Sequence, residues 1–235
     1  LFCLFSAVCT LLYVVLDRRA ALPEPSPDPA SGAPTLALGF DKRFYMLAAY
    51  CVFFYSAFFP FTGLATDFLT EKWNFSAAAA GHLTSLLTAL TIVLSPLIGG
   101  FLDRGLGRRP SSGDSAVRSR RSGRVLLFAA GLLAPAYLLL GLTGVAPLPL
   151  FVVLGLAFSL APAALWPQIP SLVPPQRVAT AYGLTTMLQS IGLAAVPWVS
   201  GALRDATTRY TASMLMFAAF GLVSTAIAWW LLRQR

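Results

Sequence analysis

Charged residues are scarce in this 235-residue chain: they make up only 11% of it, whereas 57% of the residues are hydrophobic. The mean hydropathy is +0.73. A soluble domain needs far more polar surface to face water, so the composition excludes the soluble globular classes. It is typical of a protein whose apolar side chains are covered by lipid.

Cysteine and histidine are also rare. Cys3, Cys9 and Cys51 all lie within apolar stretches, where small packing residues are a simpler interpretation than disulfides or metal ligands. The only histidine is His82, and no cluster of carboxylates or pair of nucleophile and base accompanies it. We therefore predict no enzyme activity, no catalytic residue, no metal site and no cofactor.

Stretches without Asp, Glu, Lys or Arg indicate the membrane spans. A helix needs about 20 apolar residues to cross the hydrocarbon, and the stretch 125–176, interrupted by VAPLP, should cross twice. We predict six helices at about 44–68, 76–101, 124–144, 148–173, 177–203 and 209–232, which together form a bundle over 44–235. The stretch 1–16 is too short for a complete span, and we interpret it as the end of a preceding helix. A signal peptide would carry a basic segment there, which this stretch lacks.

The distribution of basic residues predicts the orientation of the chain. Residues 17–43, rich in Pro, Ala and Ser, are predicted to form a cytoplasmic linker. With that linker in the cytoplasm, alternate loops on the same side hold all but three of the 17 Lys and Arg residues, the exceptions being Lys72, Arg204 and Arg209. This asymmetry follows the positive-inside rule, so the net charge of +8 requires no nucleic-acid partner.

The sequence GGFLDRGLGRR, residues 99–109, places charges and glycines directly at the exit of an apolar span. Gly99 permits close helix approach, and Asp103 can cap a helix or pair with an arginine. Gly107 allows a tight reversal, while Arg104 and Arg108 favour the cytoplasmic surface. The following residues 111–122 (SSGDSAVRSRRS) are interpreted as a solvated linker, with a phosphorylation target or a contact to anionic lipid as alternatives.

This loop resembles the signature loop of the major facilitator superfamily, which runs roughly Gly-x-x-x-Asp-Arg-x-Gly-Arg-Arg. The resemblance implies the carboxyl-terminal half, with six helices, of a twelve-helix carrier, together with the end of its sixth helix in residues 1–16. In that family the loop holds the two halves in one conformation, a role that would fall to Gly99, Asp103, Arg104, Gly107 and Arg108. One extra residue between Arg104 and Gly107 departs from the pattern, and an ordinary basic turn is the alternative.

Three further segments resemble the lysosomal dipeptide uniporters of this superfamily: residues 54–76 (FYSAFFPFTGLATDFLTEKWNFS), 164–174 (ALWPQIPSLVP) and 180–194 (TAYGLTTMLQSIGLA). The resemblance covers about 44–205, apart from the Arg-rich insertion. It implies transport of dipeptides or amino-acid-like solutes across the lysosomal membrane, with the plasma membrane as an alternative. It also implies two protein partners, the amino-terminal half of the same carrier and a glycosylated accessory subunit, besides contact with membrane lipid.

Trp166 is the main candidate for substrate binding. Pro162, Pro167 and Pro170 interrupt the helix around it, and such breaks are tolerated in membranes where they line protein or a wet cavity. The indole offers an apolar face, a surface for cations and one hydrogen-bond donor. A tryptophan of the membrane interface is the alternative. Tyr55 and Phe59, one turn apart, form an aromatic wall opposite Trp166 or else face lipid.

The roles of two amide side chains and of the histidine remain open. Gln189, in the middle of its predicted helix, binds polar groups of a substrate or ties helices together, and the same alternatives hold for Gln168. His82 is either a proton-coupling group or, as we prefer, an interfacial histidine.

Energy coupling and receptor function are the last open questions. The predicted spans carry no Asp, Glu, Lys or Arg deep in the membrane, whereas proton-driven carriers usually need a carboxylate there. This agrees with uniport; a proton-coupled carrier of another small solute is the alternative. A seven-helix receptor is a further alternative, but the chain lacks an extracellular cysteine pair and an Asn-Pro-x-x-Tyr ending.

Overall fold

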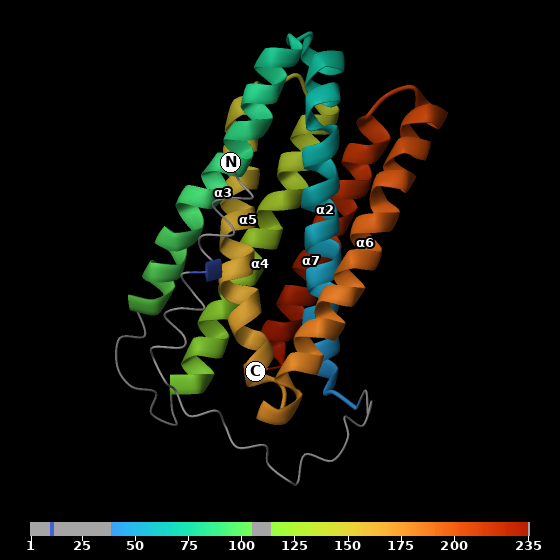
Figure 1. Cartoon of the computed structure of the whole chain (residues 1–235). Coiled ribbons are helices and arrows are strands. Elements are labelled where there is room, and N and C mark those ends of the chain that lie inside the picture. Colours follow the sequence, from blue (N-terminus) through green and yellow to red (C-terminus); the bar gives the residue numbers. More distant parts are fainter. Residues whose placement is uncertain (1–9, 12–38, 105–113, 235) are drawn as a thin grey trace. The chain divides into compact units, whose positions relative to one another are not determined.

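The structure, a computed structural model, describes residues 10–11, 39–104 and 114–234, and the side chains of these residues except 101–104 and 114–119. Residues 40–235 form one compact unit and residues 1–39 another, in which Thr10, Leu11 and Gly39 are described, the first two in a helix. No strand occurs in the described ranges. The helices of the larger unit are α2 (Lys42–Trp73), α3 (Ala77–Arg104), α4 (Asp114–Leu142), α5 (Pro147–Leu165), the short 3-10 helices η1 (Trp166–Ser171) and η2 (Pro175–Arg177), α6 (Val178–Thr207) and α7 (Thr211–Arg233) (Figure 1).

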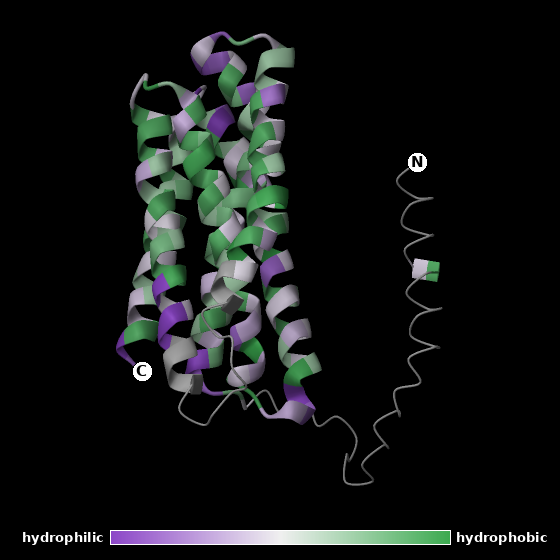
Figure 2. Cartoon of the chain, turned by 90° about the vertical axis from the view of Figure 1, so that its left-hand side faces the viewer, coloured by the Kyte–Doolittle hydropathy of each residue, from purple (hydrophilic) through white to green (hydrophobic). Residues whose placement is uncertain are grey.

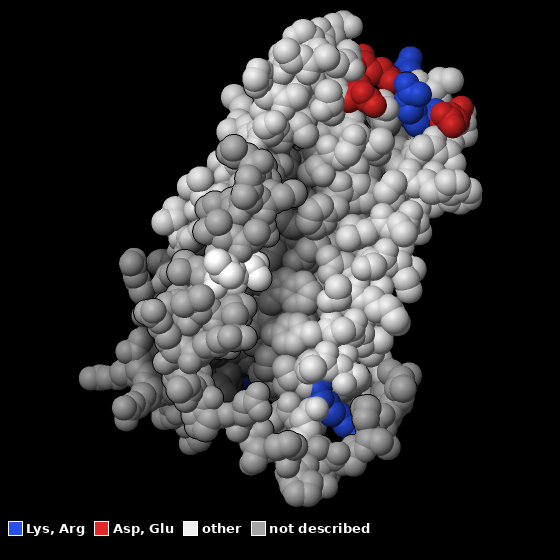
Figure 3. Space-filling model, viewed as in Figure 1, with Lys and Arg blue, Asp and Glu red and all other residues white. Residues whose placement is uncertain are grey.

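Six of these segments are long and apolar enough to cross a membrane. Hydrophobic residues dominate the middle of the helices, and hydrophilic residues gather towards their ends (Figure 2). On the face seen in Figure 3, the described charged side chains lie at the two ends, with a broad uncharged band between them. Helices suit lipid because they satisfy their backbone hydrogen bonds internally. The predicted all-α membrane bundle is therefore confirmed.

Aromatic side chains stand beside basic ones at both ends of the bundle. We call the basic end the one where α2 begins and α7 ends; there Lys42 lies 5.3 Å from the ring of Trp230, and Arg233 lies 3.6 Å from that of Trp229. At the opposite end, Lys72 lies 4.8 Å from the ring of Trp73. Such pairs are typical of the two membrane–water interfaces.

The six helices pack with an internal two-fold pattern. α4 packs most extensively on α7, while α2 packs on α6 and α7, and α5 packs on α3 and α4. Exchanging the first three helices with the last three therefore reproduces the main contacts, as expected for the inverted three-helix repeats of transporter halves. α3 and α6 lie at the flanks: only 11% and 17% of their most apolar stretches are buried, against 67% for α2.

Glycines permit the close approach of α4 and α7. A Cβ atom at Gly221 would lie 2.9 Å from the backbone nitrogen of Ala134, and one at Gly141 would lie 2.8 Å from the Cβ of Met214. Each helix of the pair thus supplies one glycine, so the two backbones pack more closely than larger residues would allow.

The helix ends follow local rules, and the largest differences from the predicted ranges are at the start of α4 and at the end of α5. Ser76, a residue type that favours the position before a helix, caps α3, since its hydroxyl accepts from the amide of Ala79 at 3.2 Å. α4 begins at Asp114, so residues 114–122, interpreted above as a solvated linker, belong to a helix; an acidic residue suits a helix start, and arginine and alanine favour helix. α5 ends at Leu165 and continues as a 3-10 helix, because Pro167 and Pro170 donate no backbone hydrogen bonds.

Substituting Gly221 by alanine should destabilise the bundle by about 1–3 kcal/mol, because the added methyl meets the backbone of α4. Gly131, also on α4, has nothing within 4 Å of its Cβ position. Gly131→Ala is the matched control and should be neutral or stabilise by up to about 1 kcal/mol through helix propensity. Thermal unfolding of the complete protein in detergent measures both; equal effects would contradict the close packing at Gly221.

Candidate functional site

Trp166 lies at the break between α5 and η1, where the helical hydrogen-bond ladder has lost donors. In a regular helix the carbonyl of Trp166 would accept from the amide of residue 170, but that residue is proline. The hydroxyl of Tyr182, on α6, donates to this carbonyl instead at 3.0 Å. In the same segment Gln168 is buried and its side-chain amide donates to the carbonyl of Ala164 at 2.8 Å. Side-chain donors thus supplement the backbone bonds at the break, and one of them brings α6 onto Trp166.

The indole of Trp166 joins α2 to α6. Its Nε1 donates to the hydroxyl oxygen of Tyr55 on α2 at 2.9 Å. On its other side the indole stacks on the ring of Tyr182, with centroids 5.9 Å apart and planes 20° apart. The structure thus brings together the predicted pair Trp166 and Tyr55, and the indole donor is directed at the tyrosine.

An aromatic cluster continues from Tyr55 along α2. Phe59 stacks on Tyr55 with centroids 5.7 Å apart and remains 42% exposed. Phe158 of α5 packs edge-on against Tyr55 at 5.5 Å and against Phe59 at 5.2 Å, and stacks on Phe58 at 3.8 Å. These contacts hold Tyr55 in one orientation, so its hydroxyl is a fixed group.

Gln189 lies on the same side of the bundle and is only 8% exposed. The thiol of Cys51, one turn before Tyr55 on α2, donates to Gln189 Oε1 at 3.7 Å. One turn further along α6, Gly192 lets the helix approach α2 so closely that a Cβ there would overlap the hydroxyl of Ser56. The contact of α2 with α6 therefore places Gln189 beside the aromatic cluster.

The remaining predicted residues lie apart from this cluster. His82 is exposed on α3. Gly99 lies in α3 with open space around its Cβ position, and Asp103 and Arg104 belong to the last turn of the same helix, although their side chains are outside the described ones. Gly107 and Arg108 lie outside the described residues. The conformational latch therefore stays a prediction.

Sequence reasoning missed Cys51, Phe158 and Tyr182. Cys51 was recoverable, because it stands four residues before Tyr55, which stands four before Phe59, so the three share one helix face. Tyr182 could in principle have been predicted as a donor, because Pro170 removes the amide that the carbonyl of Trp166 would bond in an α-helix. Nothing local distinguishes Phe158 from the many phenylalanines that pack elsewhere.

A pocket of about 620 Å³ lies at the end of the bundle opposite the basic end. It lies between the end of α2 and the connections α4–α5 and α6–α7. Its charged groups hold helix ends together: Lys72 donates to the carbonyls of Leu140 and Gly141, where α4 ends, and Arg204 pairs with Glu71 at 3.3 Å. Burial raises the pKa of Tyr210, which lines this pocket, above its ordinary value. We interpret the pocket as a structural junction.

The site formed by Tyr55, Phe59, Trp166, Tyr182 and Gln189 is uncharged. It offers aromatic faces, hydroxyls and an amide, which suit binding of a small polar molecule with apolar parts. Among the described residues no group of three His, Cys, Asp or Glu side chains is placed to hold a metal ion.

Comparison with known proteins agrees with this architecture. Residues 46–235 match the Major Facilitator Superfamily. The chain is similar to the lysosomal dipeptide transporter MFSD1 of Bos taurus (30% identity), Homo sapiens (29%) and Gallus gallus (29%), in each case over 86% of this chain. The match covers 41% of the bovine and human proteins and 43% of the chicken protein, so the chain spans about two fifths of the length of these relatives.

The family match covers the whole described bundle except the first residues of α2. It accounts for the six spans and for the inverted repeats, and it rules out the seven-helix receptor considered above. The chain belongs to the major facilitator superfamily of membrane transporters.

Proposed function

We propose that this chain is the carboxyl-terminal half of a carrier that moves dipeptides or amino-acid-like solutes across the lysosomal membrane by alternating access. The observation that carries the proposal is the bond from Trp166 to Tyr55 within an aromatic cluster, at the point where α2, α5 and α6 meet. The names of the similar transporters support the substrate class and the membrane.

The chemistry of the site supports a peptide-like ligand. A dipeptide combines apolar side chains with a planar amide, and aromatic faces with a few fixed polar groups suit both parts. Phe59 supplies exposed apolar surface, whereas Tyr55 and Gln189 supply polar atoms. The charged ends of a dipeptide need ionic partners, which we assign to the amino-terminal half.

We propose uniport as the mode of transport. No Asp, Glu, Lys or Arg occurs in 44–66, 73–102, 125–176, 178–203 or 210–232, so this half offers no carboxylate within its spans to carry a proton. The alternative, a proton-coupled carrier of another small solute, would place the coupling group in the amino-terminal half.

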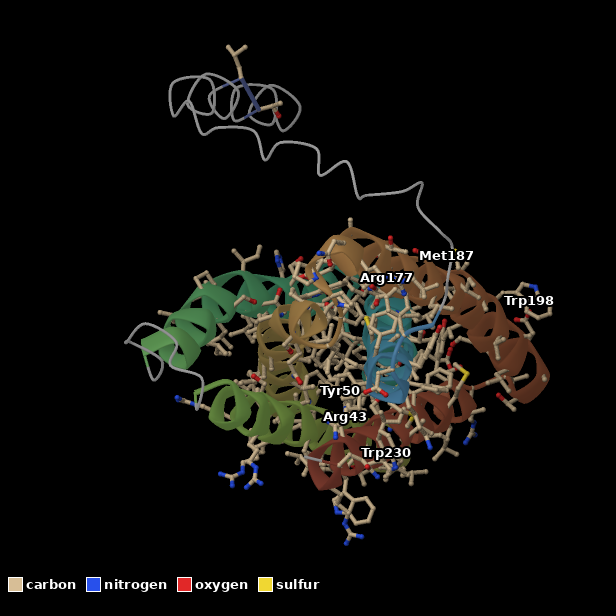
Figure 4. All side chains as sticks on the ribbon, turned by 90° about the horizontal axis from the view of Figure 1, so that it is seen from below. Arg43, Tyr50, Arg177, Met187, Trp198 and Trp230 are labelled. Carbon is tan, nitrogen blue, oxygen red and sulfur yellow. The ribbon has the colours of Figure 1, made fainter. Side chains whose placement is uncertain are left out.

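The proposal includes three partners. Exposed apolar side chains such as Met187 and Trp198 project outward from α6, which suits lipid or the amino-terminal half (Figure 4). A glycosylated accessory subunit is the third partner, proposed from the family resemblance.

The complete carrier, purified and reconstituted in liposomes, should exchange labelled dialanine without a pH gradient. Because uniport moves the substrate down its own gradient, preloaded unlabelled dialanine should drive uptake, and protonophore should not reduce it. Empty liposomes are the control. Strict dependence on a proton gradient would overturn uniport, and absence of exchange would overturn dipeptide transport.

Trp166→Phe should raise the dialanine concentration for half-maximal exchange about three- to tenfold. Phenylalanine keeps an aromatic ring against Tyr182 but removes the donor that orients Tyr55. Trp198→Phe makes the same change at a tryptophan that is 77% exposed on the outside of α6, and it should leave exchange unchanged. Equal behaviour of the two variants would contradict the assignment of Trp166 to the site.

A further inference from the structure

The direction of the hydrogen bond between Trp166 and Tyr55 determines what Tyr55 can offer a ligand. An indole nitrogen only donates, so the Tyr55 oxygen is the acceptor in this bond. The hydroxyl proton of Tyr55 remains, and no described residue accepts it. Because hydrogen bonds in a chain polarise one another, the donation from Trp166 makes this proton a better donor.

Gln189 shows the same asymmetry. Its amide oxygen receives the thiol of Cys51, while no described residue accepts from its amide nitrogen. The residue is only 8% exposed, but its amide nitrogen is not one of the enclosed atoms that lack a partner, as the hydroxyl of Ser56 is. The N–H groups of Gln189 are therefore accessible to a small ligand that offers an acceptor.

The two donors, the hydroxyl of Tyr55 and the amide nitrogen of Gln189, lie along the contact between α2 and α6. Cys51, which orients Gln189, and Tyr55 are one helical turn apart on α2, about 6 Å along its axis. In a dipeptide one residue, a span of up to about 3.6 Å, separates the peptide carbonyl from the terminal carboxylate. With a hydrogen bond of about 2.9 Å at each end, these two groups match donors that lie about one helical turn apart.

The nearby hydroxyl of Ser56 is not available as a third donor to a ligand. It has no hydrogen-bond partner among the described residues, but it is only 2% exposed and is enclosed by the close approach of Gly192. A ligand cannot reach it without separating α2 from α6.

We propose that the hydroxyl of Tyr55 and the amide nitrogen of Gln189 donate to the two acceptor groups of a dipeptide, its peptide oxygen and its terminal carboxylate. This half therefore recognises the acceptor end of the substrate with neutral donors, and Trp166 is a positioning residue that acts through Tyr55. The inference rests on the proposed function, because it concerns the ligand of the same site.

The test compares dialanine with two analogues in the complete carrier in liposomes. In thioxo-dialanine sulfur, a weak acceptor, replaces the peptide oxygen, and in alanyl-alaninol a hydroxymethyl group replaces the carboxylate. The wild type should bind each analogue several-fold more weakly than dialanine, measured as competition for exchange. Tyr55→Phe and Gln189→Leu should each lower the discrimination against one of the two analogues, and a different one in each variant. Part of the discrimination against alanyl-alaninol should remain in both, because the amino-terminal half supplies the ionic partner of the carboxylate.

The quantity compared is the ratio of analogue binding to dialanine binding within one variant. Differences between variants in folding or expression therefore cancel. Ser190→Ala is the matched control: it removes an exposed hydroxyl, bonded to the carbonyl of Thr186, next to Gln189, and should keep both ratios. If both variants keep the wild-type ratios, or weaken all three ligands equally, the donors serve contacts within the protein and the inference is overturned.

The amino end of the substrate provides a second readout. Propionyl-alanine lacks the ammonium group of dialanine, and both variants should weaken its binding by the same factor as that of dialanine. If the variants affect only dialanine, Tyr55 and Gln189 recognise the ammonium end and the inference is wrong. A wild-type carrier that does not exchange dialanine contradicts the proposed function itself, and this result precedes any variant.

Discussion

The arrangement of the site depends on one constraint, the need of every backbone carbonyl in a membrane for a donor. Pro170 supplies no amide hydrogen to the carbonyl of Trp166, so the α-helical ladder cannot continue past α5 and the chain takes 3-10 geometry in η1. The hydroxyl of Tyr182 on α6 donates to the same carbonyl, and its ring stacks on the indole. With one face covered, the indole directs its nitrogen to Tyr55. The broken helix thus determines which helices meet and which polar atoms remain for a ligand.

The frame around this break is symmetric, whereas the site is not. The two triplets of helices make equivalent contacts, with α2 on α6 and α5 on α3. A glycine lies at each of these contacts, Gly192 against Ser56 and Gly155 against Leu90. Within the described part of the bundle the 3-10 helices η1 and η2 occur only between α5 and α6, and they interrupt the repeat on one side. A carrier needs such a difference, because a repeat duplicates helices but a small ligand binds once.

Much of the fold could be predicted because lipid makes sequence patterns simple. Charge-free stretches predict the spans, and Ser76 predicts where α3 begins. The start of α4 was harder to predict, since the stretch of Ser, Arg and Ala before residue 124 suits both a linker and a polar helix end. Trp166 and Tyr55 could be proposed from chemistry, but their bond could not, because it joins residues 111 positions apart.

The neutrality of the site has a physical consequence for substrate recognition. A fixed charge within the spans would be costly whenever alternating access removes water from the site, whereas a hydroxyl or an amide costs much less. Tyr55 and Gln189 can therefore stay in place through the transport cycle, each with its oxygen already bonded to a neighbour. Donors of this kind bind carboxylates and peptide oxygens weakly enough to release them, which a carrier requires of at least one of its halves. In the proposed carrier, ionic recognition, which is stronger and more selective, would belong to the other half, so that binding would be complete only when both halves enclose the substrate.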